Sequence, residues 1–286
     1  MLGPILITML AVTPAGLESI ARDARGRVGL AAEIVETGER VELRGAERFP
    51  MQSVYKFPIA MAVLRLVDEG RLRLDAGVRI EKRDFVSPQQ HSPLRDLHPA
   101  GGFDLRLDEI LRYAVSESDG SASDVLLRLA GGAGAVRAYL RELGVTGVQV
   151  MDTEKAIGGA DGVQYRNWAT PREAVRLLKA LEQGRGLSPS SRGLLLQWMT
   201  QTPTGGNRLK GRLPAGTVVA HKTGSSRTMG GVTAATNDIG LVTLPDGRHL
   251  AIAVFVSDSA APGDVRESVI ARLARAVWDG LAGPAR

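Results

Sequence analysis

Short stretches of the chain bring hydroxyl and amino groups together at spacings that suit nucleophilic chemistry. Ser53 and Lys56 lie three positions apart in the run SVYK, at the start of a predicted helix. Side chains at positions i and i+3 share one helix face, so the Lys56 amine can reach the Ser53 hydroxyl. A partly desolvated lysine can lose its proton near neutral pH and activate the serine. Taken alone, Ser53 could equally be a helix N-cap.

Two further stretches carry a second hydroxyl and a cation. The Ser-Asp-Gly run at 118–120 follows a predicted helix and can present a hydroxyl to a cleft, although these residue types are also typical of a plain turn. The Lys-Thr-Gly-Ser run at 222–225 continues a predicted strand, where a glycine permits close backbone approach. Such a strand suits an anionic, peptide-like ligand. The alternative is a lysine that protects a sheet edge.

The composition limits which residue types could act as the nucleophile. The chain has 286 residues, of which 44% are hydrophobic and 23% charged, as is typical of a globular protein with a well-buried core. It contains no cysteine. Its histidines form no metal-binding pair and stand at His91, His98, His221 and His249. The nucleophile must therefore be a serine, a threonine, a lysine or a carboxylate.

The charge pattern argues against nucleic acid as a partner. Lys and Arg number 36 against 31 Asp and Glu, a net charge of +5, but these charges are spread along the chain. Aromatic residues make up only 4% of the sequence, so no stacking surface lies beside a basic stripe. We interpret the positive excess as an ordinary solvated surface.

The elements that must position these groups follow from hydrophobic periodicity. Strands are expected over residues 27–35, 40–43, 217–221, 238–244 and 249–256. Helices are expected over residues 55–69, 107–116, 123–129, 135–143, 171–183, 191–199 and 264–281. Strands near both ends imply that the two ends of the chain meet in one sheet, while the helical middle forms a second lobe. The predicted fold class is α+β, with a site in the cleft between the lobes.

The chain is expected to be one catalytic domain that follows an export segment. Residues 2–12 are apolar and uncharged, which is typical of a short export signal, and the run is too short to span a bilayer. We assign residues 1–16 to export and residues 17–286 to the catalytic domain. Within that domain we expect an α/β lobe (17–50 and 206–286) and a helical lobe (51–205). An apolar N-terminal segment with no role in export is the alternative.

Together and in this order, the three stretches match the S-x-x-K, S-D-N and K-T-G set of class A β-lactamases and penicillin-binding proteins. From about Leu17 onward the chain resembles a class A serine β-lactamase, most like the PER/VEB-type branch of extended-spectrum enzymes. Local runs also carry the resemblance: MQSVYK (51–56), VQYRNW (163–168), NRLKG (207–211) and HKTGSSRTMGGVTAATND (221–238). The resemblance implies the serine β-lactamase/penicillin-binding-protein-like fold, an antiparallel sheet with flanking helices plus an all-α lobe.

The resemblance also implies a role for each motif residue. Ser53 would attack the lactam carbonyl, and the backbone amides of Ser53 and Ser225 would form the oxyanion hole. Ser118 would pass a proton to the leaving nitrogen, assisted by Lys222. Residues implied in substrate binding are Thr223, Gly224, Ser225, Arg208, Gly120 and His91, and those implied in supporting the site are Asp119, Asp124 and Gln52. The base that activates Ser53 is either Lys56 or, through a water, Glu154.

Glu154 separates the two families that share these motifs. A transpeptidase needs its acyl-enzyme to persist until an amine arrives, whereas a β-lactamase needs a base that drives water onto the ester. Glu154 stands in a predicted loop where class A enzymes carry that base. We therefore predict hydrolysis of β-lactam antibiotics, namely penicillins and cephalosporins, with oxyimino-cephalosporins as a further candidate class. The alternatives are a DD-peptidase or penicillin-binding protein, and a non-hydrolytic penicillin-binding sensor.

Several positions depart from the usual class A pattern. Gly120 replaces an asparagine that binds the acylamino carbonyl of the substrate, and Gly158 replaces one that helps to hold the deacylating water. Asp124 also stands at a usual asparagine position, where it is expected to bind backbone amides of the loop. The usual Arg–Asp ion pair that closes this loop has no counterpart between Asp152 and Asn167.

The expected partners follow from the same resemblance. They are small-molecule β-lactam substrates and inhibitors, with no nucleic acid and no stable membrane association after export. No metal or organic cofactor is needed, because Lys222, Arg208 and the backbone amides would supply the positive potential. We expect a monomer, periplasmic or secreted from a bacterium.

Overall fold

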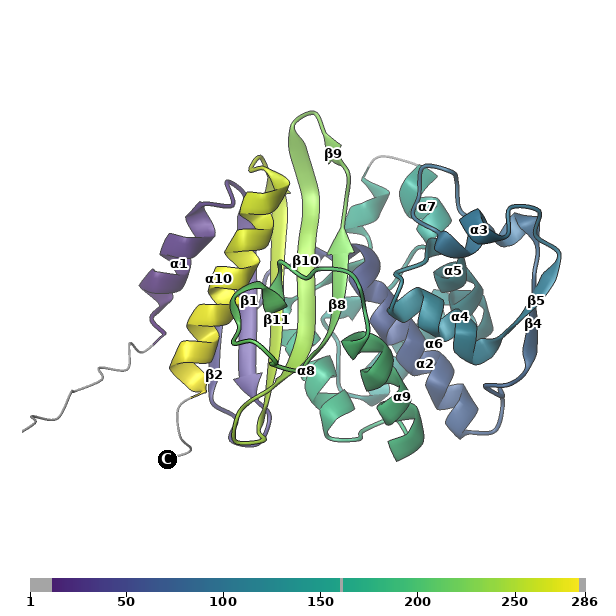
Figure 1. The fold of residues 1–286 in the computed structure, drawn as a ribbon, viewed down its shortest axis with the longest axis horizontal. Coiled ribbons are helices and arrows are strands. Elements are labelled where there is room, and N and C mark those ends of the chain that lie inside the picture. The colour runs from purple at the N-terminus through teal and green to yellow at the C-terminus, as the bar shows by residue number, and fades with distance from the viewer. Residues whose placement is uncertain (1–11, 160–161, 283–286) are drawn as a thin grey trace, which may run out of the picture.

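One antiparallel sheet joins the two ends of the chain. The computed structural model describes residues 12–159 and 162–282. Its main sheet has the strand order β2-β1-β11-β10-β8, with β9 added to β10 (Figure 1). The strands are β1 (Arg27–Ile34), β2 (Arg40–Leu43), β8 (Val219–Ser225), β9 (Thr228–Met229), β10 (Val232–Thr243) and β11 (His249–Ser259). β1 pairs with β11 along its whole length, which confirms that early and late strands meet in one sheet.

Side chains along each strand point alternately to the two faces of the sheet. In β11 the apolar side chains at even positions from 250 to 256 pack with α1 (Pro14–Arg22) and α10 (Gly263–Leu281). Those at odd positions from 251 to 255 pack with the helical part of the molecule. Successive strand side chains point to opposite faces, so this unbroken apolar run is buried on both sides. Figure 1 shows α1 and α10 together on one side of the sheet and most other helices beyond β8.

The helical part is built around α2 (Lys56–Asp68). Every residue from Lys56 to Leu64 is buried, so this helix is enclosed on all faces and carries Lys56 into the interior. The surrounding helices are α3 (Pro93–Leu97), α4 (Leu107–Val115), α5 (Gly120–Leu129), α6 (Gly132–Glu142), α7 (Glu154–Gly159), α8 (Pro171–Glu182) and α9 (Pro189–Thr200). Short 3-10 turns are η1 (Gln52–Tyr55), η2 (Lys82–Asp84), η3 (Val163–Tyr165) and η4 (Leu209–Arg212).

Two small sheets complete the described structure. The first has the order β3 (Phe49–Pro50), β7 (Trp168–Ala169) and β6 (Val148–Gln149), and it ties the start of η1 to the chain that follows α7. The second pairs β4 (Gly77–Ile80) with β5 (Phe103–Arg106) at the far end of the helical part (Figure 1).

The predicted strands and helices are confirmed, with ends that differ by up to six residues, but the predicted surroundings of Glu154 are wrong. Glu154 does not lie in a loop: it is the first residue of α7. This helix has only six residues and ends in Gly158 and Gly159, which disfavour helix, so its sequence shows no helical pattern. Likewise α5 begins at Gly120 rather than at Ser123, because the Asp119 side chain accepts a hydrogen bond from Ala122 N and caps it.

Most of the predicted export segment, residues 1–11, lies outside the described residues. Thr13 caps α1 by accepting a hydrogen bond from Gly16 N at 3.2 Å, and Pro14 is the first helical residue. Within 12–159 and 162–282, no helix is both long and apolar enough to cross a membrane.

Candidate active site

Ser53 sits in the 3-10 turn η1, immediately before α2. Asn237, which belongs to the main sheet, fixes the start of this turn. Its side-chain amide donates to Pro50 O at 2.8 Å and to Met51 O at 3.1 Å. Gln52 adopts a left-handed backbone conformation with φ of 46°, a strain that is common next to functional residues. The N-caps of η1 and α2 are Met51 and Tyr55, so the N-cap interpretation of Ser53 is wrong.

Lys56 links Ser53 to two other parts of the site. Its Nζ donates to Ser53 Oγ at 2.9 Å and to Ser118 O at 2.7 Å. The same Nζ lies 3.3 Å from Glu154 Oε2. Because the Lys56 side chain is only 1% exposed, its ammonium charge is balanced by these protein groups rather than by water.

A second buried lysine contacts the second serine. Lys222 Nζ donates to Ser118 Oγ at 2.8 Å and to Thr223 O at 3.2 Å. Burial, followed by the positive charge of Lys56, holds the pKa of Lys222 well below its usual range. Ser118 itself has φ of 59°, an uncommon value for a residue other than glycine. The Ser118 hydroxyl therefore faces a lysine that releases a proton more readily than usual.

Gly224 lets β8 press against η1. A Cβ atom at this position would lie 2.3 Å from Met51 O and 3.2 Å from Val54 N. Any residue with a side chain would therefore push β8 away from η1. The close approach brings Ser53 and Ser225 to the same cleft, as the predicted oxyanion hole requires.

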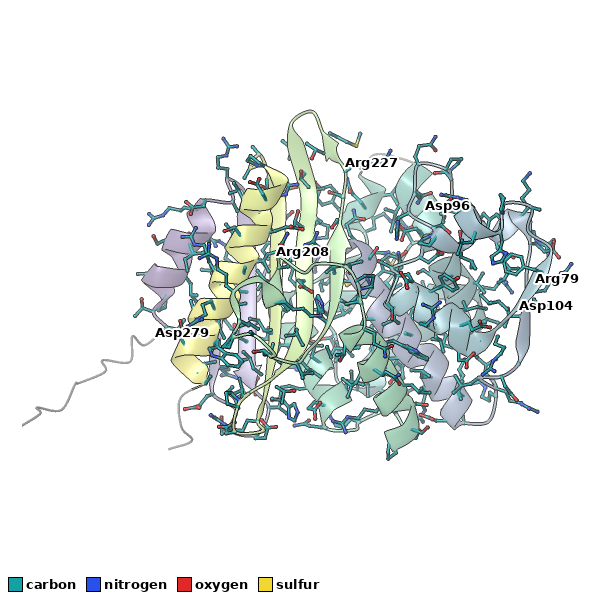
Figure 2. All side chains as sticks on the ribbon, in the orientation of Figure 1. Arg79, Asp96, Asp104, Arg208, Arg227 and Asp279 are labelled. Atoms are coloured by element: carbon teal, nitrogen blue, oxygen red, sulfur yellow. The ribbon has the colours of Figure 1, made fainter. Side chains whose placement is uncertain are left out.

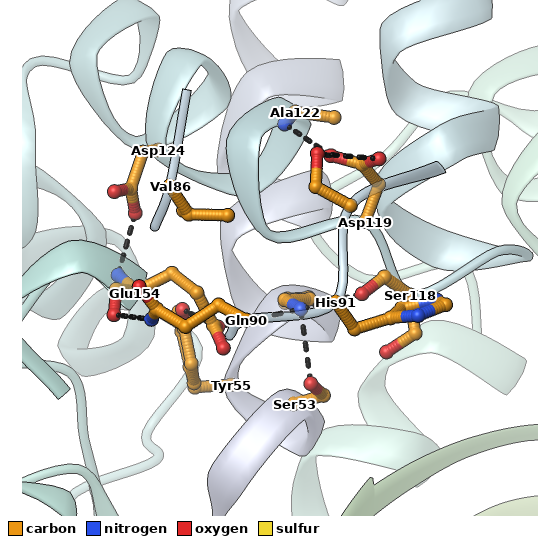
Figure 3. A network of polar contacts seen from close by, with 12 residues as sticks. Ser53, Tyr55, Val86, Gln90, His91, Ser118, Asp119, Ala122, Asp124 and Glu154 are labelled. Atoms are coloured by element: carbon orange, nitrogen blue, oxygen red, sulfur yellow. Dashed lines mark hydrogen bonds and ion pairs between the residues drawn. The ribbon is translucent and has the colours of Figure 1, made fainter. Parts of the chain in front are cut away.

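The cleft has a volume of about 590 Å³. Its lining includes six residues predicted from the sequence, namely Gln52, Ser53, Lys56, His91, Glu154 and Ser225. Figure 3 shows Glu154 with Asp124 on one side and Tyr55 on the other. Among the described residues, no group of three or more His, Asp or Glu side chains could hold a metal ion. The arrangement combines a lysine-bound serine, a second hydroxyl and a carboxylate, which is sufficient for acyl transfer to water.

The sequence and the fold were compared with known proteins. A family model described as the beta-lactamase enzyme family matches residues 15–281. The chain belongs to this family. It is 42% identical to the extended-spectrum beta-lactamase PER-1 of Pseudomonas aeruginosa over 92% of this chain and 85% of that protein. It is 37% identical to the beta-lactamase VEB-1 of the same organism, over 92% of this chain and 88% of that protein.

The fold comparison agrees with the sequence comparison. The crystal structure of a beta-lactamase from Chitinophaga pinensis superposes with a TM-score of 0.90 and 48% identity, over 93% of this chain and 97% of that chain. The predicted fold class and the predicted resemblance to class A enzymes of the PER/VEB-type branch are both confirmed.

Gly120 departs from the pattern of this β-lactamase family for a steric reason. A Cβ atom on Gly120 would lie 2.8 Å from Glu154 Cγ, 3.1 Å from His91 O and 3.3 Å from Val86 Cγ1. The Glu154 side chain therefore packs directly against the backbone of α5, at a position where any residue larger than glycine would collide with it.

We expect Gly120→Ala to slow release of the acyl group more than its formation. The added methyl group must displace Glu154, and a misplacement of about 1 Å can cost on the order of 100-fold in rate. Separate acylation and deacylation rates from stopped-flow absorbance measure this difference. Equal losses in both rates would show that the methyl group disturbs the whole cleft instead.

Gly158 leaves room for a glutamine from another part of the chain. A Cβ atom on Gly158 would lie only 2.3 Å from Gln90 Cδ. The Gln90 amide donates to Glu154 O, and its Oε1 accepts hydrogen bonds from Ser87 N at 3.2 Å and Ser87 Oγ at 3.0 Å. An amide group from position 90 thus borders the cleft beside α7.

Asp124 fastens the start of α7, as predicted. Its two carboxylate oxygens accept hydrogen bonds from Glu154 N at 2.6 Å and Lys155 N at 3.1 Å. Burial raises the pKa of Asp124 to about 6, and the negative charge of Glu154 adds to this rise, although the two backbone donors oppose it.

Asp124→Asn should therefore change how stability depends on pH. A carboxyl whose folded-state pKa is raised from 3.8 to about 6 stabilises the fold most at low pH, and this contribution is lost as pH rises through about 6. Two pKa units correspond to about 3 kcal/mol. The free energy of unfolding of the native protein, minus that of the variant, should fall by up to this amount between pH 4 and pH 8. Denaturant titrations at both pH values test this; a constant difference would contradict it.

The segment that contains α7 is closed by an amide and by an ion pair. Asn167 Oδ1 accepts from Met151 N at 2.7 Å and Asp152 N at 2.9 Å, while Asn167 Nδ2 donates to Asp152 O at 2.9 Å. As predicted, Asp152 forms no ion pair with position 167. It pairs instead with the neighbouring Arg166, whose Nε lies 3.1 Å from Asp152 Oδ2.

Arg208 lies behind β8, not in the open cleft. Its guanidinium donates to Ser225 Oγ at 2.7 Å and to Asn237 O at 2.8 Å, and Nε pairs with Glu267 at 3.0 Å. Figure 2 shows Arg208 against the sheet, whereas Arg227, which lines the cleft, lies higher, near β9. Arg208 therefore reaches the predicted carboxylate-binding strand through the Ser225 hydroxyl and the Gly224 carbonyl oxygen.

The remaining predicted residues support the walls of the site. Thr223 Oγ1 lies 2.8 Å from Thr204 Oγ1, and Gln52 Nε2 donates to Gln164 Oε1 at 2.6 Å. His91 is exposed at the cleft, and its Nε2 lies 2.8 Å from Glu117 O. Asp119 is buried and accepts from Leu94 N at 2.7 Å, which joins α3 to α5.

Tyr55 was not predicted as a functional residue. Its hydroxyl donates to Glu154 Oε2 at 2.6 Å, although the ring lies in the hydrophobic core. The only signal in the sequence is a phenol in the middle of the SVYK run, and its partner stands far along the chain.

Proposed function

We propose that this protein hydrolyses β-lactams through an acyl-enzyme on Ser53, which water activated by Glu154 then releases. The named relatives are β-lactamases, and one is described as extended-spectrum. We extend the proposal to penicillins and cephalosporins, including oxyimino-cephalosporins. Residues 17–286 would form the catalytic domain, which residues 1–16 would direct to the bacterial periplasm or out of the cell.

Formation of the acyl-enzyme needs a route for two protons. Lys56 first gives a proton to Glu154 Oε2, 3.3 Å away, and its neutral amine then takes the Ser53 proton across 2.9 Å as Ser53 Oγ attacks the lactam carbonyl. When the ring C–N bond breaks, the nitrogen takes a proton from Ser118, which Lys222 replenishes across 2.8 Å. The proton held by Glu154 then replaces the one lost by Lys222, which restores the carboxylate for deacylation. The amides of Ser53 and Ser225 would stabilise the oxyanion, and each such donor contributes about 3 kcal/mol in the transition state.

The observation that carries the proposal is the position of Glu154. Its carboxylate shares Lys56 with the nucleophile and borders the cleft next to Ser53. A water between this carboxylate and the ester could be deprotonated as it attacks, which gives the free acid and restores Ser53. A transpeptidase has no use for a base at this place.

Sustained turnover of a chromogenic cephalosporin tests the proposal. Purified protein should hydrolyse many equivalents with a linear steady state. A single stoichiometric burst with a long-lived adduct would instead favour a DD-peptidase or a penicillin-binding sensor.

A further inference from the structure

We propose that Tyr55 is a positioning residue for the general base: its hydroxyl holds one oxygen of Glu154 so that the other is left for the hydrolytic water. This inference rests on the proposed role of Glu154 in deacylation and adds a residue to it.

The geometry isolates one carboxylate oxygen. Tyr55 Oη lies 2.6 Å from Glu154 Oε2, and Lys56 Nζ lies 3.3 Å from the same atom. In the described part of the chain, both side chains that reach this carboxylate therefore meet at Oε2. The Tyr55 hydrogen bond and the Lys56 charge both act on Oε2, which holds the carboxylate in place and leaves Oε1 to accept from a water.

Tyr55 is well placed to act as a rigid donor. The residue is completely buried and packs in the core cluster of the helical part, so its ring cannot swing away from Glu154. Burial and the negative charge of Glu154 raise the pKa of Tyr55 well above its usual value, so the phenol keeps its proton over the working pH range. If the Tyr55 hydroxyl served only the stability of the core, its hydrogen-bond partner would not need to border the cleft, as Glu154 does.

A neutral donor also favours the ionised form of the carboxyl group that it contacts. Loss of the phenol hydroxyl therefore removes a contact that supports the carboxylate as a base. Other charged groups act on Glu154 as well: Lys56 from α2, Asp124 from α5 and Lys222 from β8. These groups stay in place when only the Tyr55 hydroxyl is removed.

Tyr55→Phe tests the inference because it deletes one oxygen and keeps the ring. We expect deacylation at pH 7 to slow about 10-fold, as for loss of a hydrogen bond to a charged group. The acidic limb of the deacylation rate against pH should move up by about one unit, while acylation by the chromogenic cephalosporin stays near that of the native protein. Asp124 titrates in the same region, so the shift must also appear when Tyr55→Phe is made in the Asp124→Asn background.

Tyr139→Phe is the matched control. Tyr139 is also buried, but its hydroxyl donates to Gly186 O at 3.3 Å, away from the cleft. This variant should keep the native pH profile. If Tyr55→Phe slows deacylation without moving the acidic limb, or changes acylation and deacylation alike, Tyr55 is structural and the inference fails. Failure of the proposed function looks different, because the native protein itself would then not turn over.

Discussion

Replacement of Glu154 by glutamine is expected to stop the protein after a single round of reaction. Glutamine keeps the shape of the side chain. Its oxygen can still accept a hydrogen bond from Tyr55 Oη, which lies 2.6 Å from Glu154 Oε2 in the native protein. The amide cannot take a proton from water, however, and general-base catalysis contributes about 100- to 10,000-fold. Release of the acyl group should slow by about 1,000-fold. A chromogenic cephalosporin measures this as a stoichiometric burst followed by a very slow steady state.

Glu142→Gln provides the control for this experiment. Glu142 is exposed at the end of α6, so its variant should retain full turnover. Mass spectrometry of Glu154→Gln during the slow phase should find the acyl adduct on nearly every molecule. Unaltered multiple turnover would remove Glu154 from deacylation, whereas loss of the burst itself would show that acylation of Ser53 also depends on this carboxylate.

The main sheet and the larger helices could be predicted because their signals are local. β11 is a long apolar run after a Pro-Asp-Gly turn, and α8 begins with a threonine cap followed by Pro171. β4 and β5 give a much weaker signal, because each has only four residues and they pair only with each other. Their alternation of apolar and polar residues is too short to separate them from loops.

The reacting groups could be predicted from short motifs, but their supports could not. The SVYK spacing is enough to predict the hydrogen bond from Lys56 to Ser53, because both residues lie on one turn of the chain. Gln90 and α7 are far apart in the sequence and contact each other only in the folded chain, so no local pattern predicts that contact. Arg208 shows the same limit: the resemblance implies that it binds the substrate, but no local pattern predicts that its guanidinium also binds the carbonyl oxygens of Gly224 and Asn237.

Replacement of Ser53 by alanine is expected to abolish covalent reaction altogether. Attack on a β-lactam opens the ring without loss of any atom, because the nitrogen remains tethered to the acyl group. The native protein or Glu154→Gln should therefore gain the full mass of the penicillin, whereas Ser53→Ala should gain nothing. The remaining hydroxyl of Ser118 is engaged by Lys222 at 2.8 Å and is proposed to serve the leaving group, so it offers no second route.

The control for Ser53→Ala is a serine next to the cleft that takes no part in the proposed reaction. Ser87 donates to Gln90 Oε1 at 3.0 Å, and Ser87→Ala should still form the adduct and release it. An adduct that persists in Ser53→Ala would place the nucleophile elsewhere, and peptide mapping would identify it. Because Lys56 Nζ joins Ser53 to both Ser118 and Glu154, a different nucleophile would also require different roles for these three partners of Ser53.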